Sequence, residues 1–182
     1  MQIRVTDLPA EGLKVVDHID PRQLSGLVAL QENDACVFKG PVTVTLRVLP
    51  TAGMFQVDGH IRGTASLICG RCLAPVDTPL NSTFRLSFAR TIPGDDTEAS
   101  SETRELQAEE LGVVLFEGDD IDFRDVIQEQ VIMAIPMQPL CRTECRGLCA
   151  RCGANLNDGP CDCSQNDVDP RLAILKTLKF DS

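Results

Sequence analysis

Six cysteines lie within the 23 residues from 141 to 163, and this clustering constrains the chain more than any other feature of its sequence. The stretch reads CRTECRGLCARCGANLNDGPCDC, and its cysteines are Cys141, Cys145, Cys149, Cys152, Cys161 and Cys163. Earlier in the chain, Cys69 and Cys72 have the C-x-x-C spacing of a metal-binding knuckle. Ordinary core packing does not call for so many thiols in one stretch, so the sequence predicts thiolates that bind a metal ion.

Zinc is the metal that this pattern favours, because structural zinc sites are commonly assembled from two short-spaced cysteine pairs. The C-x-x-C pair at 149–152 and the C-x-C pair at 161–163 form one such set. The pair at 141–145 could then join the pair at 69–72 in a second site that ties the tail to the rest of the chain. One mixed site that uses 69–72 and two tail thiols is an alternative, so one or two Zn²⁺ ions are expected. An iron-sulfur cluster and redox-active thiols also remain open.

The composition agrees with reduced thiols rather than disulfides. The 182 residues, 43% of them hydrophobic, suffice for one sizeable core with an appendage. The first residues, MQIRVTDLPAEGLKVV, lack the apolar run of a signal peptide, and no stretch has the roughly 18 apolar residues of a membrane span. We therefore expect a cytoplasmic protein with no membrane association, in which cysteines stay reduced.

The net charge of −10 is concentrated in one segment. Residues 93–129 contain thirteen acidic residues against Arg104 and Arg124, whereas residues 1–92 sum to +1. Such an acidic chain is not expected to bind nucleic acid strongly over its whole surface, although a local basic face could contact RNA. The acidic run is interpreted either as a solvated loop at about 91–111 or as a surface for a basic partner such as a ribosomal protein.

The periodicity of the first two thirds predicts an α+β, β-rich fold. Hydrophobic residues alternate over 42–48, 55–67 and 80–88, which is typical of half-buried antiparallel strands. The small residues Gly59, Gly63 and Ala65 suggest a bend or a close backbone approach in a curved sheet. Shorter strands are expected at 2–8, 13–19 and 113–116. We expect a curved antiparallel sheet or partial barrel in residues 1–138, with the Cys-rich tail in residues 139–182.

One helix is expected to cover the sheet. It would begin at Asp122 as N-cap and continue to Pro136, with an apolar stripe that includes Ile127 and Val131. A short closing helix is expected after Asp169-Pro170. Both are given structural roles.

Three arginines, Arg47, Arg62 and Arg85, occupy outward positions of the three long predicted strands. They would share one face if these strands are neighbours. That face is either a candidate RNA-binding surface or a solvated sheet surface. Cys36, which lies outside the clusters, is expected to be a small core residue.

Four ordered blocks resemble one known family. They are CGRCL at 69–73, AIPMQPLC at 134–141, GLCARCGANLNDGPCDC at 147–163 and DPRLAILKTLK at 169–179. Together they resemble the YceD family of large ribosomal RNA subunit accumulation proteins. The resemblance implies a cytoplasmic bacterial protein that supports accumulation or processing of 23S ribosomal RNA as an assembly factor rather than as an enzyme. Its partner would be a large-subunit precursor, ribosomal RNA or a basic ribosomal protein.

Two other functions are weighed against this one. The absence of a phosphate-binding Gly-rich loop and of a nucleophile elbow argues against an enzyme. A zinc-dependent redox-sensing chaperone is an alternative, because C-x-x-C and C-x-C thiolates can release zinc when they are oxidised. A nuclease that uses Asp119, Asp120 and Asp122 to hold Mg²⁺ is a weaker alternative, since these residues suit a loop and a helix cap.

Overall fold

The computed structural model describes residues 1–32, 36–91 and 112–163. Apart from Thr91, the acidic loop expected at 91–111 lies outside these residues, as does the closing helix expected after Asp169. The described elements are, in chain order, β1 (Gln2–Arg4), the 3-10 turn η1 (Val5–Asp7), β2 (Leu13–Ile19), the 3-10 turn η2 (Pro21–Gln23), α1 (Ser25–Gln31), β3 (Cys36–Phe38), β4 (Val42–Thr51), β5 (Met54–Ile68), β6 (Pro75–Arg90), β7 (Val113–Phe116), β8 (Asp120–Asp122) and α2 (Arg124–Met133).

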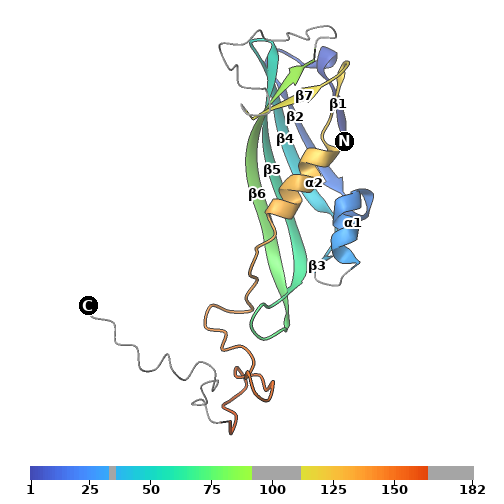
Figure 1. Ribbon diagram of the computed structural model, residues 1–182. Coiled ribbons are helices and arrows are strands. Elements are labelled where there is room, and N and C mark those ends of the chain that lie inside the picture. Colours follow the sequence, from blue (N-terminus) through green and yellow to red (C-terminus); the bar gives the residue numbers. More distant parts are fainter. Residues whose placement is uncertain (33–35, 92–111, 164–182) are drawn as a thin grey trace, which may run out of the picture.

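An open, curved sheet forms the body of the molecule, in the order β2-β4-β5-β6-β7, with β3 paired to β5 beyond the end of β4 (Figure 1). All of these pairings are antiparallel except that of β6 with β7, which is parallel. The β-rich α+β class expected from the sequence is confirmed. The parallel pair arises because the chain returns to the edge of β6 through residues 91–112 instead of through a tight hairpin turn.

The alternating residues separate into a buried inner face and an exposed outer face, as their period of two requires. Val44 and Leu46 of β4 and Val57 and Ile61 of β5 are 0% exposed on the inner face. Helix α2 covers this face with Ile127 and Val131. The sequence predicted one covering helix, whereas in the structure α1 packs beside α2 (Figure 1).

Some predicted ends shift by a few residues. The first strand stops at Arg4 because η1 follows it, and it pairs with β8 in a separate two-stranded sheet. Asp122 belongs to β8, and Phe123 occupies the N-cap position of α2. Asp122 still accepts a hydrogen bond from the Arg124 N–H at 3.0 Å, so it satisfies one of the free amides at the start of the helix.

Gly59 confirms the close approach expected in β5. It lies opposite Phe84 of β6, and a Cβ atom at Gly59 would overlap the Phe84 ring. The ring therefore fills the space above the glycine on the inner face. Gly63, four residues further on, has room for a Cβ, whose nearest neighbour would be Val42 Cγ2 at 3.4 Å.

The long β5–β6 hairpin carries the chain away from the helices. Its pairing runs from Met54–Ala89 to Ile68–Pro75, so the turn at 69–74 stands at the far end of the sheet. The chain after α2 runs down to this turn and folds beside it (Figure 1). None of the helices in the described residues has the length and apolar character needed to cross a membrane.

Candidate metal centres

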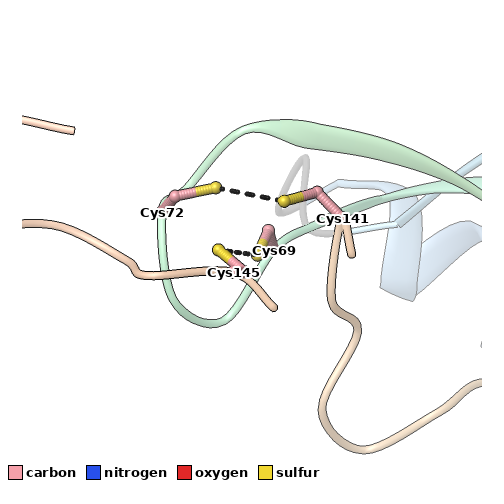
Figure 2. A group of neighbouring side chains, drawn as sticks. All are labelled: Cys69, Cys72, Cys141 and Cys145. Atoms are coloured by element: carbon pink, nitrogen blue, oxygen red, sulfur yellow. Dashed lines mark hydrogen bonds between the residues drawn. The ribbon is translucent and has the colours of Figure 1, made fainter. Parts of the chain in front are cut away.

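The turn of the β5–β6 hairpin and the chain after α2 bring together four cysteines, Cys69, Cys72, Cys141 and Cys145. Their sulfur atoms lie within 4.8 Å of one another and point into a common space (Figure 2). The Cys72–Cys141 sulfurs are 3.6 Å apart and the Cys69–Cys145 sulfurs 3.9 Å apart. A tetrahedral zinc ion with bonds of about 2.3 Å holds its sulfurs about 3.8 Å apart, so this spacing fits a single ion.

The second cluster lies entirely in the tail. Cys149, Cys152, Cys161 and Cys163 also have their sulfurs within 4.8 Å of one another. The cysteines of both clusters are free thiols. Of the two partitions left open by the sequence, the structure therefore groups the thiols as two sets of four rather than as one mixed set.

The two C-x-R-C segments have the same backbone conformation. In the first, the Leu73 N–H donates to Cys69 O at 3.0 Å and the Cys69 N–H donates to Ala74 O at 2.9 Å. In the second, Gly153 N–H donates to Cys149 O at 2.9 Å and Cys149 N–H to Ala154 O at 2.8 Å. The residue after each second cysteine has a positive φ, 60° at Leu73 and 71° at Gly153. Both segments are thus knuckles of one kind.

This turn aims backbone amides at the first sulfur of each knuckle. The N–H groups of Cys72 and Arg71 lower the pKa of Cys69 to about 6. The N–H groups of Cys152 and Arg151 lower the pKa of Cys149 to about 6 in the same way. Each knuckle is therefore arranged to hold a thiolate, which is the form that binds metal.

One thiol in each cluster behaves in the opposite way. Contact with the Cys72 thiol raises the pKa of Cys141 to about 12, and contact with the Cys152 thiol raises that of Cys163 to about 12. Four negative charges within 4.8 Å repel one another too strongly to form together in the absence of a cation. A divalent cation would remove this repulsion, so the donor set fits a bound metal ion.

Hydrogen bonds fasten the tail to the hairpin turn and connect the two clusters. Gly70 N–H donates to Pro139 O at 2.9 Å, and the Arg71 guanidinium donates to Cys145 O at 2.9 Å. Between the cysteine pairs of the second cluster, the Asn157 side-chain amide donates to Cys145 Sγ of the first cluster at 3.4 Å and lowers the pKa of that thiol. Neither Arg71 nor Asn157 was predicted from the sequence. Asn157 lies between the two cysteine pairs of the second cluster, and residues between metal-ligand pairs often support the ligands.

The clusters differ in how far solvent reaches them. Cys69, Cys72 and Cys145 are 0%, 7% and 3% exposed, and they pack against the partly buried Leu140 and Leu148. In the second cluster, Cys152 is exposed and the other three cysteines are partly exposed. Cys36 is buried in the main core at 5% exposure, away from both clusters, as expected from the sequence.

The three outward arginines lie on one face, as the sequence predicted. Arg47, Asp58 and Arg85 stand opposite one another across β4, β5 and β6, and Arg62 lies further along β5. Arg85 Nε donates to Asp58 Oδ1 at 2.6 Å. Arg62 Nε donates to His60 Nε2 at 3.2 Å. The acids considered for Mg²⁺ are paired with arginines, since Asp119, Asp120 and Asp122 form ion pairs with Arg90, Arg4 and Arg124.

The chain is similar to several known proteins. The relatives include a chloroplastic protein of Arabidopsis thaliana named large ribosomal RNA subunit accumulation protein YCED homolog 1, 26% identical over 76% of this chain and 49% of its own length. An uncharacterised protein of Mycobacterium tuberculosis is 32% identical over 71% of this chain and 58% of its own length. YlbN of Bacillus subtilis, also uncharacterised, is 29% identical over 76% of this chain and 74% of its own length. The chain thus spans about half the length of its chloroplastic relatives.

No solved structure matches the chain significantly. The family model described as large ribosomal RNA subunit accumulation protein YceD matches residues 57–179. This range begins in β5 and contains the hairpin turn, α2 and all eight clustered cysteines. It confirms the resemblance read from the four sequence blocks, and the chain belongs to the YceD family.

Proposed function

We propose that the protein is a cytoplasmic, non-enzymatic factor that supports 23S ribosomal RNA accumulation or processing and assembly of the large ribosomal subunit. The observation that carries the proposal is the family match over residues 57–179, together with the names of the chloroplastic relatives. Its partner is a large-subunit precursor, through ribosomal RNA or a basic ribosomal protein. The comparisons do not favour a redox-sensing chaperone.

Two zinc ions, one in each cysteine cluster, complete this proposal. Four cysteines around one ion make a closed site with no position left for water, and closed zinc sites are structural. The first ion would join the β5–β6 hairpin to the tail, and the second would hold the tail's own loop. The role proposed for zinc is therefore to give the C-terminal region one fixed shape for docking.

Metal content tests the zinc part directly. Protein purified without chelator is expected to contain two equivalents of zinc by elemental analysis. Less than half an equivalent of any metal would refute the proposal of bound zinc. Iron together with sulfide would show an iron-sulfur cluster in its place.

Ribosome profiles test the cellular role. Cells that lack the gene are expected to show a reduced ratio of 23S to 16S ribosomal RNA and an excess of precursor particles in sucrose gradients. The tagged protein is expected to co-sediment with large-subunit precursors. Normal RNA ratios and gradients in the deletion strain would refute the proposal.

The acidic segment gives this docking a second test. The net negative charge of residues 93–129 would attract a basic ribosomal protein. If it makes that contact, a chain without residues 93–111 should co-sediment less with the precursors. Unchanged co-sedimentation would remove the segment from the mechanism.

A further inference from the structure

The outer face of the sheet is a broad surface that no described element covers. Both helices lie on the opposite side, where Ser82 of β6 donates to Gln130 of α2 at 3.4 Å and Ile127 is fully buried. The outward residues of β2, β4, β5 and β6 come into register in rows across the four strands.

This face is basic although the chain is acidic. One row consists of Lys14, Arg47, Asp58 and Arg85, and Arg62 stands four residues from Asp58 along β5. Asp58 forms an ion pair with Arg85, and neither Lys14 nor Arg47 forms an ion pair with a described residue. With strands about 4.8 Å apart and residues about 3.3 Å apart, the four cations cover a patch of about 14 by 13 Å.

Four polar side chains beside the cations can contact phosphate and ribose. In the next two rows, Thr43, Thr45, Asn81 and Thr83 offer hydroxyl and amide groups, which bind phosphate oxygens and 2′-hydroxyls. These rows also contain His18, His60 and the exposed Val16. The described outward positions of the strands carry no phenylalanine, and the chain has no Trp or Tyr. The surface therefore lacks the large aromatic rings on which single-stranded bases usually stack.

We propose that this outer face, formed by Lys14, Arg47, Arg62 and Arg85, binds the sugar-phosphate backbone of double-helical RNA. The inference rests on the proposed function and names the partner of one surface. Because the contacts are to backbone, binding is independent of sequence and depends on salt. The face has four cations and one paired acid, which corresponds to about three phosphate contacts. The logarithm of the binding constant should then fall with the logarithm of salt concentration with a slope of about −3.

Binding of the full chain to a 20-base-pair RNA duplex of arbitrary sequence, followed by fluorescence anisotropy between 50 and 200 mM NaCl, tests the proposal. Non-specific contacts of this number predict a Kd on the order of 10 µM at the lowest salt. A single strand of the same length should bind more weakly. The variant Arg47→Gln, Arg62→Gln, Arg85→Gln should lose at least about tenfold in affinity, and its salt slope should approach zero.

A matched variant controls for net charge. Arg4→Gln, Arg22→Gln, Arg124→Gln removes the same three charges from residues outside the face, each of which is ion-paired to a nearby aspartate. It should bind the duplex within about twofold of the parent chain. The proposal is overturned if the parent chain shows no binding at 200 µM protein, if both triple variants lose the same affinity, or if the single strand binds more tightly than the duplex.

Complementation of the deletion strain separates this inference from the proposed function. If the face variant fails to restore 23S ribosomal RNA while the control variant restores it, both are supported. If the face variant restores it fully, the RNA-binding face is refuted and the proposed function stands. If the parent chain itself has no effect on ribosomal RNA, the proposed function fails, whatever the outcome of the duplex titration.

Discussion

Replacement of Cys145 by serine should release the tail from the hairpin while the sheet stays folded. Ordering the ten or so residues from 139 to 148 costs on the order of 10 kcal/mol of backbone entropy. Hydrogen bonds across the contact return about 1 kcal/mol each. Three of those between the described residues end on carbonyl oxygens: Gly70 N to Pro139 O, Arg71 Nη1 to Cys145 O, and Leu148 N to Arg71 O. A structural zinc ion would contribute about 10–16 kcal/mol, so a metal bound to the first cluster would decide whether the tail docks.

Hydrogen exchange followed by mass spectrometry, with metal analysis, measures this effect. In Cys145→Ser, zinc should fall from two equivalents to one. Peptides that cover residues 69–74 and 145–149 should lose protection by at least about a hundredfold, because opening the contact no longer breaks a metal site. Peptides from β4 should exchange as in the parent chain, because none of the buried residues of the main core belongs to the tail.

Cys36→Ser is the matched control. It also removes a buried thiol, but one outside both clusters, so it should retain two equivalents of zinc and full protection of the hairpin turn. If Cys145→Ser keeps both zinc equivalents, or if the turn stays protected with one equivalent, the first cluster does not hold the tail and the reasoning is wrong.

Three further changes test separate parts of the structure. Gly59→Ala should destabilise the protein by about 1–3 kcal/mol in urea unfolding, because its Cβ would overlap the Phe84 ring, whereas Gly63→Ala should change stability by less than about 0.5 kcal/mol; equal effects would contradict the packing. Asn157→Asp should keep two zinc equivalents, but chelator competition should show about 10–100-fold weaker affinity for one of the two ions, because the substitution removes the N–H donor to Cys145 Sγ. Unchanged affinity for both ions would exclude a role of this hydrogen bond in metal binding. Asp122 has a pKa lowered to about 2 by its hydrogen bonds to the Arg124 side chain, so its contribution, under about 1 kcal/mol, is present above pH 4 and is lost as the pH falls through 2. Asp122→Asn should therefore be less stable than the parent chain at pH 6, and the difference should shrink through pH 2 and vanish about one pH unit below it; a difference that does not shrink over this range would contradict this.

Local spacing determined the parts of the fold that the sequence predicted well. Alternation over 42–48, 55–67 and 80–88 identified the long strands and separated the inner from the outer residues, because successive side chains of a strand must point to opposite faces. The spacing of hydrophobic residues found α2 in the same way, through the period of a helix. The position of the cysteine pairs followed from C-x-x-C and C-x-C spacing alone.

Contacts between distant segments were decided only by the tertiary structure. The parallel pairing of β7, the small sheet of β1 with β8 and the shift of the helix start depend on which distant segments meet, and no local pattern encodes this. The grouping of Cys69 and Cys72 with Cys141 and Cys145 is of the same kind, because about 70 residues separate the two pairs. The sequence supplied the cysteines in pairs, and the length of the β5–β6 hairpin, together with the exit of the chain from α2, decided which pairs meet.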